Sequence, residues 1–313
     1  MKRMYDFGNI SSETGFNTVQ IEKVCRISDI LENISQVRFM RNRLSLYGGT
    51  ALAFIHFDAV ERISVDIDFN YRHIDDGDWG KVRDRIDSNM KTILYGLGYF
   101  DSDIRINSTH PLNRFTVKYR NHLGRPDEIK IETGYMRRIP ILKEDKEYDF
   151  YHVGSHNRFK ILTPVREELF GNKWCTMLYR GSPRDLFDVY RIAESMFDMD
   201  VFRRTAVIDS LMRGLPRLFD VDYRERIQGI PFDSSLLNML YGGNEFDAGV
   251  VHEEVIDFTG SVLNRLSYEE KGLIETFYDE LRLDGSIVSK IGGINDDIAN
   301  HPLILWQIKQ LSG

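Results

Sequence analysis

The spacing of hydrophobic residues changes along the chain and separates a mixed first half from a helical second half. Apolar residues recur at helical spacing from about Thr18 to about Met40 and again over residues 79–97. Strands are predicted where the sequence is briefly apolar or alternates with a period of two, at Leu44–Tyr47, Ile63–Phe69, Arg114–Tyr119 and Glu128–Thr133. The first half therefore mixes both kinds of element.

After residue 162 the pattern becomes that of helices alone. Thr163-Pro164 and Ser182-Pro183 have the residue types of an N-cap followed by proline at the first helical position. Further helical periodicity follows at Thr205–Leu215, Val250–Leu266, Tyr268–Leu283 and Leu303–Leu311. We predict an α+β protein, with a mixed sheet and flanking helices in residues 1–160 and an all-α helical bundle in residues 161–313.

Composition adds that the chain is globular. Its 313 residues are enough for two domains, and 42% of them are hydrophobic, which is sufficient for a packed core. No apolar run approaches the length of a membrane helix, and the first residues lack the apolar stretch of a signal peptide. Only two cysteines are present, without metal-site spacing. We expect a cytoplasmic protein without a membrane partner.

Charge is unevenly distributed along the chain. The net charge of −7 argues against a protein that coats nucleic acid by bulk electrostatics. The acidic excess falls in residues 161–313, whereas the stretch from Arg114 to Lys143 is rich in Lys and Arg. That stretch could face a polyanion, or its cations could simply protect a hairpin edge from aggregation, and charge alone favours neither.

Asp66 and Asp68 are the first candidates for chemistry. They alternate with Val65, Ile67 and Phe69, so both carboxylates leave one face of a strand whose other face is apolar. Two carboxylates on one face can share hard divalent cations, which take oxygen ligands. The simpler interpretation is an exposed strand with a polar outer face, and the spacing alone favours that one.

Gly48, Gly49 and Thr50 strengthen the case for a functional site. A strand that ends in two glycines and enters a helix at a hydroxyl residue exposes backbone N–H groups, which stabilise an anion such as a triphosphate. An ordinary tight turn with Thr50 as N-cap is the alternative. The Asp-x-Asp strand that follows supports the first interpretation.

Glu132 is the third acidic candidate. It alternates within a predicted strand and would join Asp66 and Asp68 if the two strands are neighbours. A two-metal phosphoryl-transfer site needs such an acidic group near the attacking hydroxyl. Lys130 shares the strand face of Glu132, and without the other motifs a Lys–Glu cross-strand pair would be the preferred explanation.

Lys173, Asp185 and Asp188 form a later group in the helical half. Lys173 falls in line with the apolar residues of its predicted helix, where a charge requires an anionic partner and could reach a phosphate. Asp185 lies in the first turn of the next helix, where capping alone favours a carboxylate, and Asp188 is one turn further. Caps and a surface ion pair are the alternative for these aspartates.

Other motifs are missing from the sequence or do not fit. Neither a Gly-x-x-x-x-Gly-Lys phosphate loop nor a Gly-x-Gly-x-x-Gly motif occurs. His152 and His156 have the spacing of a helical metal pair, but Gly154 and Ser155 between them make a helix unfavourable. We interpret both as loop histidines.

The combination of these motifs resembles the AbiEii/AbiGii family of abortive-infection nucleotidyltransferase toxins, within the polymerase-beta-like superfamily. The resemblance rests on Gly48-Gly49-Thr50-Ala51-Leu52-Ala53, on Arg62-x-Ser64-x-Asp66-Ile67-Asp68-Phe69, and on Lys173 with Arg180-x-x-Pro183-Arg184-Asp185-Leu186-x-Asp188. It covers roughly residues 44–190. One departure is Glu132, since many superfamily members have Asp at the third acidic position.

This resemblance implies a nucleotidyltransferase fold and transfer of a nucleoside monophosphate from an NTP, with Mg²⁺ or Mn²⁺, to an acceptor hydroxyl. It implies a type IV toxin–antitoxin system, tRNA as a plausible acceptor and a cognate antitoxin as partner. The implied roles are metal binding by Asp66, Asp68 and Glu132, nucleotide binding by Gly48, Gly49, Thr50, Ser64 and Lys173, and completion of the site by Lys173, Asp185 or Asp188 from the first two helices of the helical domain.

Two alternatives remain open at this point. A protein or a small molecule could be the acceptor, since the basic segment favours RNA only mildly. The chain could instead be a binding module with a degraded active site, and Mg²⁺-dependent binding of NTP would separate that from an intact carboxylate cluster.

Overall fold

The structure is a computed structural model, and it describes residues 3–74, 78–242 and 246–313. The chain forms two compact units. The first comprises Met1–Arg138, Lys146–Thr163 and Met239–Asn244, and the second comprises Ile139–Asp145, Pro164–Asn238 and Glu245–Gly313. These units are defined by contacts between residues and not by independent folding. The domain boundary near residue 160 therefore stays a prediction.

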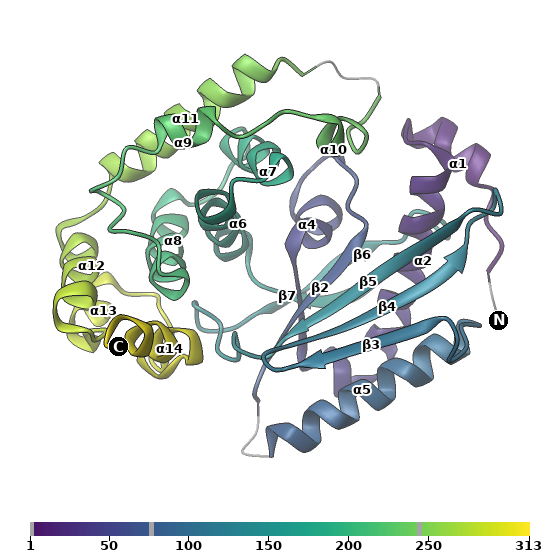
Figure 1. The fold of residues 1–313 in the computed structure, drawn as a ribbon, viewed down its shortest axis with the longest axis horizontal. Coiled ribbons are helices and arrows are strands. Elements are labelled where there is room, and N and C mark those ends of the chain that lie inside the picture. The colour runs from purple at the N-terminus through teal and green to yellow at the C-terminus, as the bar shows by residue number, and fades with distance from the viewer. Residues whose placement is uncertain (1–2, 75–77, 243–245) are drawn as a thin grey trace. The chain divides into compact units, whose positions relative to one another are not determined.

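A five-stranded mixed sheet forms the centre of the first unit (Figure 1). Its order is β1-β2-β5-β4-β3, with β2 and β5 parallel and the other neighbours antiparallel. The strands are β1 (Leu44–Tyr47), β2 (Asp66–Tyr71), β3 (Ile104–Thr109), β4 (Leu112–Arg120) and β5 (Pro126–Gly134). The predicted α+β class with a mixed sheet is confirmed.

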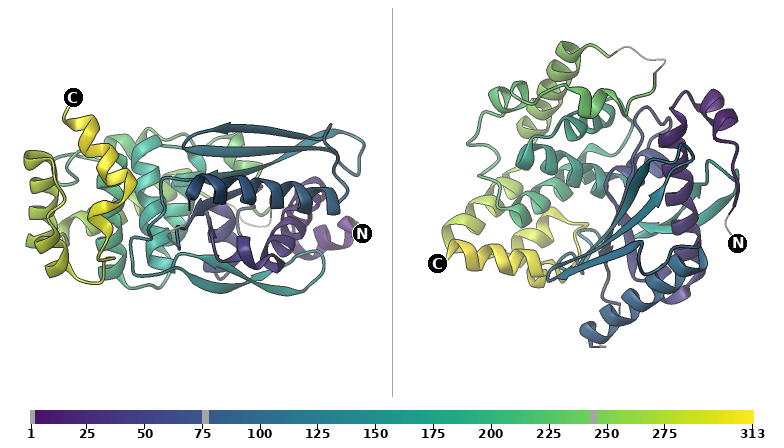
Figure 2. Two further views of the ribbon diagram at one scale, coloured as in Figure 1. Left: turned by 90° about the horizontal axis from the view of Figure 1, so that it is seen from below. Right: turned by 45° about the vertical axis from the view of Figure 1, so that its right-hand side comes forward.

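The two faces of this sheet differ in polarity. Ile67, Phe69 and Ile131 are buried on one face, where α2 (Thr18–Gln36) and α5 (Trp79–Gly96) lie along the sheet (Figure 2). The side chains between them in sequence, which include Asp66, Asp68 and Glu132, leave the opposite face because side chains alternate along a strand.

Several helices around the sheet differ from the sequence-based expectation. The helix predicted to reach Met40 ends at Gln36, because Val37 is extended, and a short α3 (Arg38–Arg41) follows. The segment after β1 continues α4 (Gly48–Ala51) as a π-helical turn, η1 (Leu52–His56). An additional helix, α1 (Phe7–Thr14), is capped by Asp6.

A hairpin completes the first unit. It consists of β6 (Lys146–Tyr151) and β7 (Arg158–Thr163), which pair in an antiparallel ladder. Thr163 is the last residue of β7, and its buried hydroxyl donates to the Leu46 carbonyl, so the predicted N-cap role of Thr163 is wrong. His152 and His156 lie in the connection between the two strands.

The second unit is helical in the part that the structure describes. Its helices are α6 (Arg166–Arg180), α7 (Pro183–Ala193), α8 (Met199–Arg213), α9 (Arg224–Gln228), α10 (Ser234–Leu237), α11 (Ala248–Asn264), α12 (Tyr268–Glu280), α13 (Gly285–Ile291), η2 (Ile298–Asn300) and α14 (Pro302–Leu311). Ser182 caps α7 and Pro183 is its first residue, as predicted. None of the described helices is long and apolar enough to cross a membrane.

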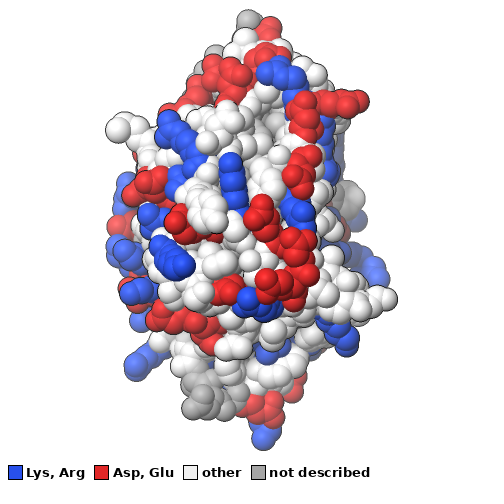
Figure 3. Space-filling model, turned by 90° about the vertical axis from the view of Figure 1, so that its left-hand side faces the viewer, with Lys and Arg blue, Asp and Glu red and all other residues white. Residues whose placement is uncertain are grey.

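The acidic excess of the helical half does not gather into one patch on the face shown in Figure 3. Asp and Glu are interspersed there with Lys, Arg and uncharged side chains. Ion pairs such as Arg203 with Asp200 and Arg217 with Asp279 belong to this unit and pair opposite charges locally.

Candidate nucleotidyl-transfer site

The first two acidic candidates lie next to the third. β2 and β5 are parallel neighbours, and the register pairs Asp68 with Glu132 and Asp66 with Lys130. Paired residues on neighbouring strands are about 4.8 Å apart and point to the same face. The adjacency on which the prediction for Glu132 depended is therefore present.

Glu132 is held from its other side. Its Oε1 accepts a hydrogen bond from Nε of Arg114 at 2.6 Å, and Arg114 is its cross-strand partner on β4. Because both side chains are partly exposed, this ion pair contributes little to stability, but it fixes the direction of the carboxylate. The cross-strand cation is thus an arginine and not a lysine, and Lys130 on the same strand lies near Glu128 at 3.7 Å.

The glycine pair approaches the acidic strand closely. Gly48 has φ of 69°, and a Cβ built there would lie 2.1 Å from Oδ2 of Asp68. A Cβ on Gly49 would lie 2.6 Å from Nη2 of Arg62 and 2.9 Å from Oγ of Ser64. Both positions therefore need glycine, one for its backbone conformation and both for the space that neighbouring polar groups occupy.

The buried Thr50 side chain links the glycine turn to the start of β2. It is fully buried, and its hydroxyl donates to the Asp66 carbonyl at 2.5 Å and lies 3.0 Å from Oγ of Ser64. The hydroxyl is thus committed to protein atoms. This arrangement gives the Thr50 side chain a positioning role at the start of β2, and the predicted contact of this side chain with nucleotide stays a prediction.

Lys173 lies between two aspartates in the second unit. Its Nζ is 3.0 Å from Oδ1 of Asp185 and 2.9 Å from Oδ2 of Asp188, and all three residues are buried. Asp185 also accepts hydrogen bonds from Arg180, at 2.5 and 2.9 Å, and from the Ser182 hydroxyl at 2.6 Å. Asp185 is fully buried, so its ion pairs are not surface pairs, while its place in the first turn of α7 beside the N-cap Ser182 is the one that capping favours.

Electrostatics keep Asp185 ionised. Burial alone would raise the pKa of this carboxyl, but the Lys173 ammonium and the Arg180 guanidinium lower it well below its ordinary value. Because the carboxylate accepts charge-assisted hydrogen bonds from α6 and from the turn before α7, the cluster fastens these two helices to each other.

A separate Asp–Glu–His group was missed by sequence analysis. Among the described residues, Asp29, Glu32 and His152 bring potential metal-binding atoms within 4.8 Å of one another. More than a hundred residues separate His152 from the two carboxylates in sequence, so no motif could reveal them.

The hydrogen bonds of His152 argue against a metal at that group. Its Nδ1 accepts from the backbone N–H of Gly154 at 3.1 Å and of Ser155 at 3.3 Å, so the ring proton resides on Nε2, which faces Asp29 at 3.2 Å. Arg3 contacts both Asp29 and Glu32. The Arg3 guanidinium and the His152 ring N–H therefore already occupy the positions that a metal ion would take.

A mixed sheet that brings Asp68 beside Glu132, next to a glycine turn, is the arrangement expected of a nucleotidyltransferase, and comparison with known proteins agrees. The model of the AbiEii family, described as nucleotidyl transferase AbiEii toxin of a type IV toxin–antitoxin system, matches residues 29–237. The chain belongs to this family, and it is a nucleotidyltransferase. No curated protein matches the sequence.

A solved structure has the same fold. The nucleotidyltransferase toxin MenT4 from Mycobacterium tuberculosis H37Rv superposes with a TM-score of 0.63 at 16% identity, over 92% of this chain and 99% of MenT4. An antigenic nucleotidyltransferase-like protein from Paracoccidioides brasiliensis gives 0.36 at 16% identity, over 55% and 76% of the respective chains. The MenT4 match extends the shared fold beyond the residues that the family model covers.

Proposed function

We propose that the chain transfers a nucleoside monophosphate from an NTP to an acceptor hydroxyl, at the sheet face that carries Asp66, Asp68 and Glu132. The observation that carries the proposal is the pairing of Asp68 with Glu132 on parallel strands, with Gly48 against the Asp68 carboxylate. An all-oxygen set of donors suits Mg²⁺ or Mn²⁺. A bound ion would supply charge to the phosphates and to the attacking oxygen.

The chain's own residues hold the reactants in this proposal. The backbone of Gly48, Gly49 and Thr50 and the hydroxyl of Ser64 face the triphosphate, and the acceptor hydroxyl displaces pyrophosphate from the α-phosphate. The contact of Lys173 with phosphate stays a prediction, since its ammonium already has Asp185 and Asp188 as partners.

The polar sheet face supports a polyanionic acceptor, and we propose tRNA. Strand register puts Arg105, Thr116, Lys130 and Asp66 in one row across four strands. The next row is Asn107, Arg114, Glu132 and Asp68. Cations thus lead across the sheet to the carboxylates, as the contacts to a phosphate backbone require. We also propose a cytoplasmic location and a cognate antitoxin as partner.

The test is incorporation of labelled NTP into purified tRNA and total RNA with Mg²⁺. We expect incorporation that is lost in EDTA and falls by about a thousandfold or more in Asp68→Asn and Asp66→Asn, because metal and phosphate charge would no longer be balanced. Glu128→Gln, on the same strand face as Glu132, is the matched control and should keep activity. Undiminished incorporation in both Asp variants would refute the site.

The acceptor is tested separately by mass spectrometry. RNA and proteome are incubated with the chain and each of the four NTPs, and we expect a mass increase of one or more nucleotides on tRNA. Labelled protein or small molecule with unmodified tRNA would contradict the proposed acceptor while leaving the transfer activity intact.

A further inference from the structure

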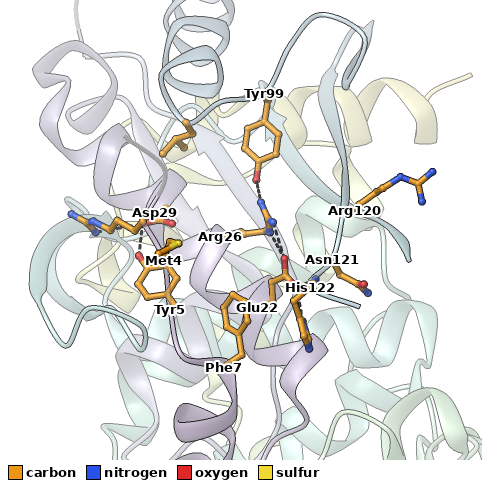
Figure 4. Close-up of a pocket in the computed structure, with 12 residues that line it drawn as sticks. Met4, Tyr5, Phe7, Glu22, Arg26, Asp29, Tyr99, Arg120, Asn121 and His122 are labelled. Atoms are coloured by element: carbon orange, nitrogen blue, oxygen red, sulfur yellow. Dashed lines mark hydrogen bonds and ion pairs between the residues drawn. The ribbon is translucent and has the colours of Figure 1, made fainter. Parts of the chain in front are cut away.

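A cavity of about 300 Å³ opens in the first unit, away from the carboxylate site (Figure 4). It lies between the segment before α1, one side of α2 and the turn after β4. Arg26 of its wall stacks over Tyr119 at 4.2 Å, on the sheet face that α2 covers. Asp68 and Glu132 leave the other face, and the six residue-to-residue steps from Pro126 to Glu132 alone span about 20 Å. The cavity is therefore not part of the transfer site.

The carboxylates inside the cavity wall already have partners. Figure 4 shows Arg26 between Tyr99 and Glu22, with hydrogen bonds of 3.1 Å to the Tyr99 hydroxyl and of 2.7 and 3.0 Å to Oε1 of Glu22. His122 donates to Oε2 of Glu22 through its backbone N–H at 2.6 Å and contacts it through Nδ1 at 2.7 Å. Asp29 accepts from the Tyr5 hydroxyl at 2.7 Å.

The unused hydrogen-bonding capacity of the cavity consists of donors. Asn121 is only 7% exposed, and its Oδ1 accepts from the N–H groups of Leu123 and Arg125. Within the described part of the chain, nothing accepts from its Nδ2. Arg120 donates once, to the Gly124 carbonyl at 2.8 Å, and its other N–H groups likewise lack an acceptor among the described residues. A ligand that satisfies these groups must bring acceptor oxygens.

The walls also favour a flat ring and a negative charge. Phe7 stands with its ring centroid 5.3 Å from that of His122, beside Tyr5, and Tyr99 closes the other end. Of the three arginines in the lining, Arg3 pairs with Asp29 and Glu32 and Arg26 pairs with Glu22, which leaves Arg120 as the cation that pairs with no carboxylate of the described residues. The volume is at the small end of the range of roughly 300–1,000 Å³ for ligand sites, so a large cofactor does not fit.

We propose that this cavity is a second site, which binds a mononucleotide with its base against Phe7 and its phosphate at Arg120 and Asn121. The inference does not depend on the transfer reaction, because none of these residues is assigned to the metal, the nucleotide or the acceptor at the carboxylate site. The site would let the chain respond to the level of a nucleotide that is not its NTP substrate.

The experiment is isothermal titration of the full chain with adenosine and uridine monophosphates in EDTA. We expect binding that Arg120→Ala weakens about tenfold, the loss expected for one hydrogen bond to a charged group. Arg125→Ala removes an exposed arginine of the same turn that does not line the cavity, and should leave the affinity unchanged. Asp68→Asn should also leave it unchanged.

The opposite pattern would overturn the proposal. Binding that is lost in Asp68→Asn but kept in Arg120→Ala would locate the nucleotide in the transfer site, and absence of binding to the wild-type chain would exclude the second site outright. Phe7→Leu should weaken binding of the monophosphates but not that of inorganic phosphate. Equal affinities for inorganic phosphate and the nucleotides would contradict recognition of the base. Incorporation of labelled NTP is measured independently, so failure here leaves the transfer proposal standing.

Discussion

A single buried hydroxyl connects the glycine turn to the acidic strand. The sequence suggests Thr50 as an N-cap, and that residue type is common at helix starts. What the sequence could not reveal is the direction of its hydroxyl, which points to the Asp66 carbonyl and to Ser64 rather than to solvent. The local sequence pattern predicts the turn, whereas the hydrogen-bond partner of the Thr50 hydroxyl depends on how β1 and β2 pair.

Thr50→Val therefore tests a positioning role. The change keeps the shape and removes the hydroxyl, so we expect the free energy of unfolding to fall by about 1–2 kcal/mol. We also expect kcat to fall about tenfold or more with little change in KM, because Asp66 loses its support. Thr50→Ser retains the hydroxyl and should restore most of both quantities. Chemical denaturation and steady-state kinetics measure them, and a change confined to KM would indicate direct nucleotide contact instead.

The buried carboxylate of Asp185 in the second unit leads to a prediction about how the free energy of unfolding depends on pH. The pKa of Asp185 is lowered in the folded chain, so its contribution to stability is complete above its unfolded pKa of about 3.9 and is lost as the pH falls toward the folded value. At neutral pH we expect Asp185→Asn to cost about 3–5 kcal/mol, since Lys173 and Arg180 lose a buried partner. The difference from wild type should shrink below about pH 4. Denaturation at a series of pH values measures it, and a constant difference down to pH 2 would contradict this assignment.

At the scale of elements, the strands that build the site were predictable and the pairing between them was not. The alternation around Asp66 and around Glu132 predicts two strands, and both are present with boundaries shifted by a few residues. Sequence alone left open whether these strands are neighbours, because β3 and β4 intervene in the chain but not in the sheet. The segment Leu52–His56 also deviates from the predicted helix, as a π-helical turn rather than an α-helix.

Gly48, the first residue of α4, and Gly124, in the turn between β4 and β5, offer a matched pair of glycine variants. Gly48→Ala and Gly124→Ala both put alanine at positive φ, 69° and 74° respectively, and each should cost about 1–2 kcal/mol of unfolding free energy. Only the Gly48 variant pushes a methyl group into the Asp68 carboxylate, since nothing lies within 4 Å of a Cβ at Gly124. We expect transfer activity to be lost in the first and kept in the second. Equal activity in both would show that Asp68 tolerates displacement.

For the whole molecule, sequence motifs were sufficient for the family and for the α+β class, because both depend on residues close together in the chain. Features formed by distant segments were not predictable. The Asp29, Glu32 and His152 group and the cavity beside Asn121 each join parts of the chain that no spacing rule relates. The completion of the site by the first two helices of the second half stays a prediction.

The parallel pairing of β2 with β5 has a consequence during synthesis. Asp66 and Asp68 leave the ribosome more than fifty residues before Glu132, and the strand that carries Glu132 must exist before the sheet face is whole. A growing chain therefore cannot complete the pairing of β2 with β5 until translation has passed Gly134. A truncated product that stops before residue 132 lacks the third carboxylate altogether.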